Sequence, residues 1–279
     1  MSSYAYFNGT FGKKEEISIP LSDRSIYFGD AIYDAAIGSY DRILWEEEHI
    51  KRFLSNARKI GIQHNFTEEY LSALLREVAV KSMLKCYFIY FQMSRSLPDR
   101  IHSPVGAKAN LLITVDPIQI NPAPKPLNLI TVIDRRFGYC NIKTTNLLPS
   151  VLASEKAEKS GCDEAVFVKG NYVTECAKSN ISILKQGRII THPINRRILP
   201  GIARSHLLAH CNRLNIPCIE QPFSVSDMLS ADEILVTSTT KLCRITEHIN
   251  GIKVGSNDIK TANNLCKLMY SEFNEFCLK

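Results

Sequence analysis

The stretch DPIQINPAPKP, residues 116–126, decides how the chain is divided. It holds four prolines in eleven residues. Proline lacks a backbone N–H and fixes φ, so such a stretch continues neither a helix nor a central strand. We therefore predict a small N-terminal α/β domain over residues 1–118, a proline-rich linker over 119–126, and a C-terminal domain over 127–279.

Both halves mix segments with the two-residue period of strands and the three-to-four-residue period of helices. The first half is predicted to form strands at 4–7 and 17–19 around an Asn8-Gly9 turn, helices at 46–60 and 67–82, and strands at 86–94 and 110–115. The second half is predicted to form strands at 127–134, 164–168, 172–175, 180–184, 188–191 and 233–237, and helices at 149–160, 202–213 and 258–276. The fold class is therefore α/β, of the α+β type, with two mixed domains and a site expected in the cleft between them.

Composition excludes several classes of protein. Of the 279 residues, 45% are hydrophobic and 22% charged, as in a globular protein. The net charge of +6 is spread along the chain without long runs of like charge, so nucleic-acid binding is not indicated. The nine cysteines are odd in number and form no CxxC pair, which indicates free thiols in a reducing compartment and no metal site.

The N-terminal sequence MSSYAYFNGTFGKKEE has no basic start followed by an apolar run, so it does not resemble a secretory signal. No stretch of about 18 apolar residues is present, so no membrane contact is expected. We expect a cytoplasmic protein.

Lys143 is the first candidate for chemistry. It lies in Cys140-Asn141-Ile142-Lys143-Thr144-Thr145-Asn146, between a predicted strand and a predicted helix. A lysine desolvated in a cleft becomes a nucleophilic amine. Taken alone, however, a lysine before a helix is more often an exposed surface residue.

Polar residues at strand and helix ends form further candidates in the second half. Glu175 ends one predicted strand, and Ser179-Asn180 begin the next. A carboxylate placed there could bind a protonated ring nitrogen, or could be a solvated turn residue. Leu199 to Arg204 leads into a predicted helix, whose first N–H groups could bind a phosphate, and Ser238-Thr239-Thr240 adds hydroxyl groups. Both are also ordinary loop compositions.

The first half offers two basic groups. Arg52 on the predicted helix 46–60 could reach a phosphate, or could be an exposed helix arginine. Arg95, Arg100 and His102 lie in the loop SRSLPDRIHSP, where they could recognise a carboxylate or form a solvated basic loop.

Taken in order, these groups resemble the fold-type IV enzymes that use pyridoxal 5′-phosphate (PLP), over nearly the whole chain. The matching segments are Asp23-Arg24, Phe28-Gly29-Asp30, Glu48-His49-Ile50, Arg52, Ile142-Lys143, Asn146-Leu147-Leu148, Thr174-Glu175, Ser179-Asn180, Thr191-His192-Pro193, Leu199 to Arg204, and Val236 to Thr240. Within the family, the segment from Phe91 to His102, with its Arg100-x-His102 pair, is most similar to D-amino-acid (D-alanine) aminotransferases.

The resemblance implies a role for each matched residue. Lys143 matches the lysine that forms the Schiff base with PLP and moves the proton at Cα. Glu175 matches the carboxylate that pairs with the pyridine nitrogen. The other cofactor-binding matches are Arg52, Ile202, Ala203, Ser238 and Thr239 around the phosphate, Leu199 on the ring face, and Ser179 near the lysine. Substrate-binding matches are Tyr33 and Thr239, with Arg100 and His102 contributed by a second subunit. A homodimer with sites shared between subunits follows from that match.

The chain departs from the subfamily at several positions. Ala203 stands where a threonine is common, so one hydroxyl for the phosphate is missing. Ala177 and Lys178 replace serines, and Lys241 replaces a small polar residue after the Ser-Thr-Thr run. Ala31 and Asp34 replace a glycine and a glutamate. These changes bear on substrate choice, and the added amines of Lys178 and Lys241 could alter it.

The resemblance implies transfer of the amino group of a D-alanine-like amino acid to a 2-oxo acid such as 2-oxoglutarate, with PLP as cofactor. The alternatives are an aminodeoxychorismate lyase, against which the Arg100–His102 pair argues, and a branched-chain amino-acid aminotransferase. A PLP-binding protein without turnover is a further alternative, opposed by the intact set of Lys143, Glu175, Arg52 and Tyr33.

Overall fold

The computed structural model describes residues 3–121 and 125–278. Its contacts divide the chain into two compact units. The first holds the described residues up to Gln119 together with Ile142–Asn146, and the second holds Ile120–Asn141 and the residues from Leu147 onward. Residues 122–124 of the expected linker 119–126 lie outside the described residues, so the linker stays a prediction. The five residues around Lys143 fold with the first unit, although they lie in the second half of the sequence.

An antiparallel sheet of six strands forms the first unit, in the order β2-β1-β6-β5-β3-β4. Its strands are β1 (Tyr4–Phe7), β2 (Thr10–Lys13), β3 (Ala31–Ser39), β4 (Arg42–Ile43), β5 (Cys86–Ser96) and β6 (Lys108–Pro117). β3 pairs along its whole length with β5. Successive side chains of a strand point to opposite faces, so Tyr33 and Asp34 lie on different faces of the sheet.

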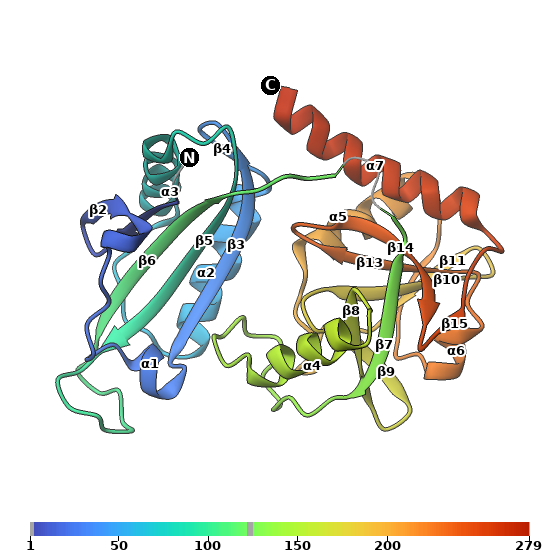
Figure 1. Ribbon diagram of the computed structural model, residues 1–279, viewed down its shortest axis with the longest axis horizontal. Coiled ribbons are helices and arrows are strands. Elements are labelled where there is room, and N and C mark those ends of the chain that lie inside the picture. The colour runs from blue at the N-terminus through green and yellow to red at the C-terminus, as the bar shows by residue number, and fades with distance from the viewer. Residues whose placement is uncertain (1–2, 122–124, 279) are drawn as a thin grey trace. The chain divides into compact units, whose positions relative to one another are not determined.

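Helices α2 (Glu46–Lys59) and α3 (Glu68–Ser82) lie on one face of this sheet (Figure 1). The short helices η1 (Lys14–Glu16) and α1 (Arg24–Phe28) lie in the connections. α2 buries Ile50, Phe53, Leu54 and Ala57, which recur at three- and four-residue steps. Glutamates in its first turn and basic residues in its last turn complement the helix dipole.

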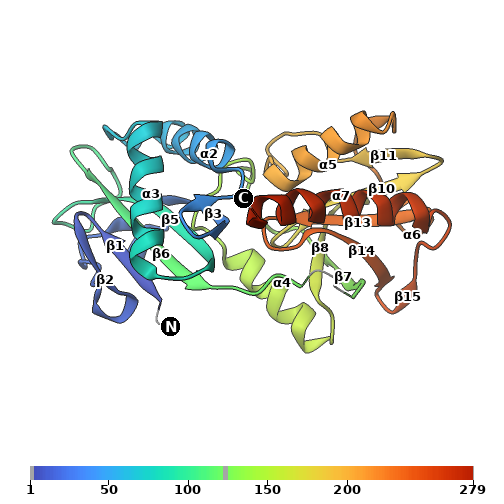
Figure 2. The same ribbon diagram turned by 90° about the horizontal axis from the view of Figure 1, so that it is seen from above.

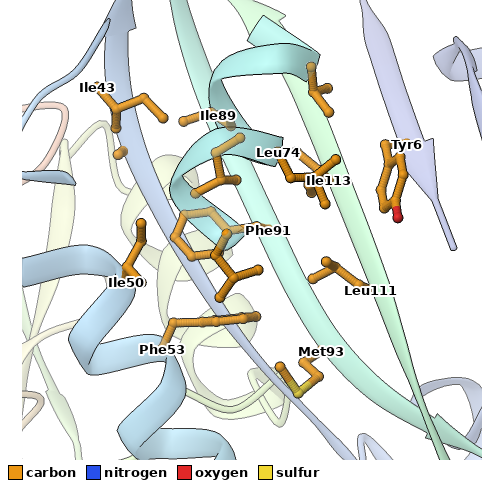
Figure 3. Close-up of a cluster of buried hydrophobic side chains, with 14 of the residues drawn as sticks. Tyr6, Ile43, Ile50, Phe53, Leu74, Ile89, Phe91, Met93, Leu111 and Ile113 are labelled. Atoms are coloured by element: carbon orange, nitrogen blue, oxygen red, sulfur yellow. The ribbon is translucent and has the colours of Figure 1, made fainter. Parts of the chain in front are cut away.

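The core of the first unit lies between these two helices and the sheet. Figure 3 shows Phe53 of α2 and Leu74 of α3 among side chains of β5 and β6 such as Phe91 and Leu111. The rings of Phe53 and Phe91 meet edge to face with centroids 4.8 Å apart. This packing fixes α2, and with it Arg52, against β3.

A sheet of nine strands forms the second unit, in the order β12-β11-β10-β13-β14-β7-β8-β9, with β15 also paired to β14. Its strands are β7 (Leu127–Ile133), β8 (Glu164–Lys169), β9 (Tyr172–Cys176), β10 (Asn180–Lys185), β11 (Arg188–Thr191), β12 (Cys218–Glu220), β13 (Glu233–Ser238), β14 (Leu242–Ile249) and β15 (Ile252–Lys253). β10 and β13 are antiparallel, with Asn180 opposite Thr237. The start of β10 and the end of β13 therefore lie at the same end of the sheet.

The described residues of the second unit also form four helices: α4 (Leu148–Lys159), α5 (Ile202–Arg213), α6 (Val225–Leu229) and α7 (Ile259–Leu278). Figure 2 shows α5 and α7 side by side, and both contact β13 and β14. None of the helices in the described ranges is long and apolar enough to cross a membrane. All nine cysteines are free thiols, as expected.

The predicted α/β class is confirmed, since both units mix sheets with helices. The predicted strand at 17–19 is wrong, because the partner of β1 is Thr10–Lys13. The cause is the Asn8-Gly9 turn, in which both residues have positive φ. Such a two-residue hairpin turn pairs Phe7 directly with Thr10, so the second strand must begin at once.

Candidate active site

Lys143 is held beside the start of β3 by backbone hydrogen bonds. The Tyr33 N–H donates to the Lys143 carbonyl at 2.9 Å, and the Thr145 N–H donates to the Ala31 carbonyl at 3.1 Å. Ile32 and Thr144 form an antiparallel bridge between the two segments. The main chain therefore fixes Lys143 beside Tyr33, although 110 positions separate them in sequence.

The amine of Lys143 contacts the phenol of Tyr33. Its Nζ lies 3.3 Å from the Tyr33 hydroxyl and 4.3 Å from the centre of the ring. The Tyr33 ring stacks on Tyr90 at 5.3 Å, and the Tyr90 hydroxyl donates to Gln92 Oε1 at 2.6 Å. Burial raises the pKa of Tyr90, so this hydroxyl stays protonated. A primary amine is thus oriented on an aromatic platform, a contact worth about 0.5–1 kcal/mol.

Asp34 anchors two side chains of α2. Arg52 donates to its two carboxylate oxygens from Nε at 2.8 Å and from Nη2 at 2.7 Å. His49 Nδ1 lies 2.8 Å from Asp34 Oδ1. Burial by itself raises the pKa of Asp34, but Arg52 and His49 outweigh it and hold this pKa well below its usual range. The ionised carboxylate therefore holds the guanidinium of Arg52 by a bidentate pair of hydrogen bonds.

His49 is fully buried beside this carboxylate. Burial lowers its pKa and outweighs the opposing effect of Asp34, so the imidazole is neutral near pH 7. Because ionised Asp34 only accepts hydrogen bonds, Nδ1 carries the single ring proton. Its Nε2 is buried and has no hydrogen-bond partner among the described residues.

Arg100 and His102 lie against α1 in the first unit. The Arg100 guanidinium is 5.0 Å from the ring centre of Phe28, and the His102 ring is 5.2 Å from the same ring. Arg24 donates to the carbonyl of His102 at 2.8 Å and so holds the loop. Both side chains are exposed. The structure therefore groups them with Phe28 and not with Lys143 or Tyr33.

Glu175 lies in a buried charged cluster of the second unit. Arg136 Nη1 donates to Glu175 Oε1, and Arg136 Nη2 donates to Asp134 at 2.8 Å. The guanidinium also stacks 4.3 Å from the ring centre of Phe167. Burial opposes the charge of Arg136, but the two carboxylates outweigh it and raise its pKa above the usual range. Arg136 therefore supplies a permanent counter-charge to Glu175.

Asn180 connects Glu175 to the segment before α5. Its side-chain amide donates to Glu175 Oε2 and to the Leu199 carbonyl, both at 3.0 Å. The Leu199 N–H donates to the same Glu175 oxygen at 3.0 Å. A Cβ added to Gly201 would lie 1.8 Å from Asn180 Oδ1, so any side chain there would force Asn180 to move. This close approach sets the start of α5.

The start of α5 and the turn after β13 supply anion-binding groups. Gly201 is the N-cap, and Ile202 and Ala203 form the buried first turn, where backbone N–H groups lack helical partners. Ser238 ends β13 and Thr239 follows in the turn. Ser179 immediately precedes Asn180 and therefore lies at the same end of the sheet as Ser238. Helix starts and hydroxyl groups are common ligands of phosphate.

The structure thus gathers the predicted residues within each unit. Lys143 meets Tyr33 in the first unit, and Glu175 meets Leu199 in the second. The sequence analysis assigned no role to Arg136, His49 or Asn180. Asn180 stood next to Ser179, and His49 stood in the segment that matched the family. Arg136 follows a predicted strand as one of two arginines, and only its position in space reveals its partner Glu175.

Comparisons with known proteins identify the family of this chain. The family model for amino-transferase class IV matches residues 32–249. A D-alanine aminotransferase of Staphylococcus aureus (strain N315) is 35% identical over 259 residues, covering 90% of this chain and 92% of that protein.

Two solved structures share the fold. A branched-chain aminotransferase of Thermoproteus uzoniensis, solved with norvaline, has a TM-score of 0.89 at 22% identity and covers 99% of this chain and 97% of that one. A branched-chain amino acid aminotransferase of Escherichia coli has a TM-score of 0.86 at 20% identity, with coverage of 97% and 94%. The family match covers most of the chain and agrees with the resemblance of its motifs. This chain belongs to the class IV aminotransferases.

Proposed function

We propose that this protein is a PLP-dependent transaminase that moves the amino group of a D-alanine-like D-amino acid to a 2-oxo acid such as 2-oxoglutarate. The observation that carries the proposal is the Lys143 amine, held 3.3 Å from the Tyr33 hydroxyl in a class IV aminotransferase. The D-alanine aminotransferase of S. aureus, at 35% identity, supports the stereochemistry.

The chemistry of the available groups fits PLP. Its aldehyde requires a primary amine, its pyridine nitrogen a carboxylate, and its phosphate N–H and hydroxyl donors. Lys143 supplies the amine, and Glu175 supplies a carboxylate that is only 6% exposed. The phosphate donors are supplied by Ile202, Ala203, Ser238, Thr239 and Arg52. When bound, PLP withdraws electrons from the substrate Cα and stores the amino group between the two half-reactions.

Lys143 has two tasks in this proposal. Its Nζ would hold the cofactor at the aldehyde carbon. The same Nζ would also act as the base that moves the proton at the substrate Cα. The contact with the Tyr33 hydroxyl orients the amine for this transfer.

Glu175 would hold the protonated pyridine nitrogen of the cofactor. Arg136, Asn180 and the Leu199 N–H hold the carboxylate in place. These three donors stabilise its ionised form, which can then bind a protonated ring nitrogen. Leu199 would pack on the ring face of the cofactor, and Ser179 would lie near the ring.

The start of α5 would hold the phosphate of the cofactor. Backbone N–H groups of Ile202 and Ala203 would donate to it, and the hydroxyls of Ser238 and Thr239 would add further donors. Arg52 adds a positive charge, oriented by its pair with Asp34. Ala203 contributes its backbone alone, because it has no hydroxyl.

The substrate carboxylate is bound by Tyr33 and Thr239 of one subunit with Arg100 and His102 of the partner subunit. Exposure of Arg100 and His102 on the isolated chain supports this assignment, since both remain available to another chain. The active protein is thus a homodimer with shared sites, and we propose that it works in the cytoplasm.

The stereochemical test is a half-reaction with purified holoenzyme. D-alanine, L-alanine, D-leucine, L-leucine or aminodeoxychorismate is added singly, and the visible absorption of the bound cofactor is followed. We expect D-alanine to remove the visible band and to release pyruvate. Loss of the band with L-leucine alone would indicate a branched-chain aminotransferase, and pyruvate from aminodeoxychorismate would indicate the lyase. No change with any compound would contradict transaminase activity.

A further inference from the structure

The buried carboxylate of Glu164 joins two turns at one end of the second sheet. Glu164 is the first residue of β8 and has no exposed surface. Three donors reach it: the Lys178 backbone N–H at 2.6 Å, the Ser179 hydroxyl at 2.9 Å and the Lys241 ammonium at 2.7 Å. Lys178 and Ser179 lie between β9 and β10, whereas Lys241 lies between β13 and β14.

The ion pair between Lys241 and Glu164 is largely shielded from water. The side chain of Lys241 is 17% exposed and that of Glu164 is 0% exposed. The Lys241 Nζ also lies 3.4 Å from the Ser179 hydroxyl oxygen. Because a buried carboxylate without its counter-charge is strongly unfavourable, loss of Lys241 should displace the groups around Glu164.

The backbone of Lys241 is tied to Ser238. Its N–H donates to the Ser238 hydroxyl oxygen at 3.2 Å, and the Tyr270 hydroxyl donates to its carbonyl at 3.5 Å. The side chain of Lys241 therefore contacts Glu164 and the turn that holds Ser179, while its main chain bonds Ser238. The Ser238 hydroxyl is thus hydrogen-bonded to the main chain of Lys241.

We propose that Lys241 is a positioning residue for the cofactor phosphate: its ion pair with Glu164 fixes the turn that carries Ser238 and Thr239. The inference rests on the proposed function, in which those two residues bind the phosphate. Lys241 replaces a small polar residue of the subfamily. In this proposal its amine acts on cofactor binding through Glu164, and it does not act on the substrate. Because Ala203 offers the phosphate no hydroxyl, the placement of Ser238 and Thr239 matters more here.

The test compares binding of PLP with binding of pyridoxal, which lacks the phosphate. Apoenzymes of the wild type, K241M, K241R and K178M are titrated with each compound, and dissociation constants are read from the absorption of bound cofactor. We expect K241M to weaken PLP binding by about tenfold or more, as for a lost hydrogen bond to a charged group. Pyridoxal binding should change much less. K241R keeps the charge and should resemble the wild type.

K178M is the matched control, because Lys178 meets Glu164 through its backbone N–H and its side chain can be changed without loss of that bond. Equal PLP affinities of K241M and K178M would overturn the inference, and so would equal losses for PLP and pyridoxal. The double variant E164Q/K241M has no unpaired buried charge and provides the same comparison if K241M does not fold. Its PLP affinity should lie below that of the wild type, and wild-type affinity would contradict the inference. A wild-type protein that binds no PLP would instead overturn the proposed function itself.

Discussion

The buried imidazole of His49 makes the stability of the first unit depend on pH. Its pKa is lowered by burial, whereas an unfolded histidine has a pKa of about 6.5. Below that pH the unfolded state binds more protons than the folded state. The free energy of unfolding therefore decreases as the pH is lowered. The contribution of His49 is complete above about pH 6.5 and is lost as the pH falls toward the lowered folded value. The carboxylate of Asp34 does not titrate there, since its pKa lies far lower.

We expect the free energy of unfolding of the wild type to decrease between pH 7 and pH 5 more steeply than that of His49→Gln. Urea titrations followed by circular dichroism at several pH values measure this slope. His64 and His192 also have lowered pKa values, so the difference between variants is the relevant quantity. His102→Gln is the control, because His102 is exposed. Identical slopes for the wild type and His49→Gln would contradict the assignment of a neutral buried His49.

For single residues, the sequence reveals those whose type and order match a family, such as Lys143 and Glu175. It does not reveal residues defined by their partners in space. Arg136 lies 39 positions before Glu175 and Asp34 lies 18 positions before Arg52. No periodicity links such pairs, because the contacts depend on how the strands pair and where α2 packs.

Strand β3 depends on a glycine near its end. A Cβ added to Gly38 would lie 2.1 Å from ring atoms of Tyr87, which is fully buried and donates to the Arg42 carbonyl at 3.0 Å. Because burial and this hydrogen bond hold Tyr87 in place, Gly38→Ala should destabilise the protein by about 1–3 kcal/mol, as overpacking does. Thermal or chemical denaturation measures the change.

Gly138→Ala provides the matched control for this prediction. A Cβ at Gly138 meets no atom within 4 Å, and Gly138 is not among the residues with positive φ. Its effect should stay within about 0.5 kcal/mol. Equal stabilities of the Gly38 and Gly138 variants would disprove the close contact with Tyr87.

The start of α5 also depends on a glycine that is closely approached by a side chain. A methyl group at Gly201 would displace Asn180, which bonds both Glu175 and the Leu199 carbonyl. Gly201→Ala should therefore weaken PLP binding about tenfold or more, since a hydrogen bond to a charged group is worth about 1.5–3 kcal/mol. Titration of the apoenzyme with PLP measures the affinity, with Gly138→Ala again as the control. Unchanged affinity would show that Asn180 does not hold the site.

Elements with a strong local signal could be predicted from sequence. The helix predicted at 202–213 is α5, and the helix predicted at 46–60 ends one residue earlier, at Lys59. The strand at 17–19 failed because the predicted pairing ignored the length of the turn at Asn8-Gly9. The order of strands in either sheet could not be read from the sequence, since it depends on pairings between distant segments such as β1 and β6.

The proposed sharing of sites between subunits allows two inactive chains to complement each other. We expect Lys143→Ala and Arg100→Ala each to reduce activity severely. After the two are unfolded together and refolded, activity should return to roughly a quarter of the wild-type value, because half of randomly paired dimers are hybrids with one intact site. The assay is pyruvate formation from D-alanine and 2-oxoglutarate.

Each variant refolded alone is the control for this experiment. Sedimentation at equilibrium gives the mass of the particle. A monomer, or a mixture no more active than its components, would contradict a site to which Arg100 of the partner subunit contributes.

The composition of the chain, and the mixture of predicted strands and helices in both of its halves, predicted the α/β class correctly. The grouping of residues 142–146 with the first unit was not predictable from the proline-rich stretch. It arises from hydrogen bonds between this segment and β3, such as that from Tyr33 to Lys143, which join residues distant in sequence.

The proposed function requires that Lys143 carries the cofactor. Holoenzyme is reduced with borohydride, digested, and analysed by mass spectrometry for a peptide bearing the phosphopyridoxyl group. We predict that the modified residue is Lys143 and that Lys143→Ala retains no cofactor after the same treatment. Modification of another lysine, such as Lys178 or Lys241, would contradict the assignment of Lys143 as the lysine that carries the cofactor. Retention of the label by Lys143→Ala would contradict it as well.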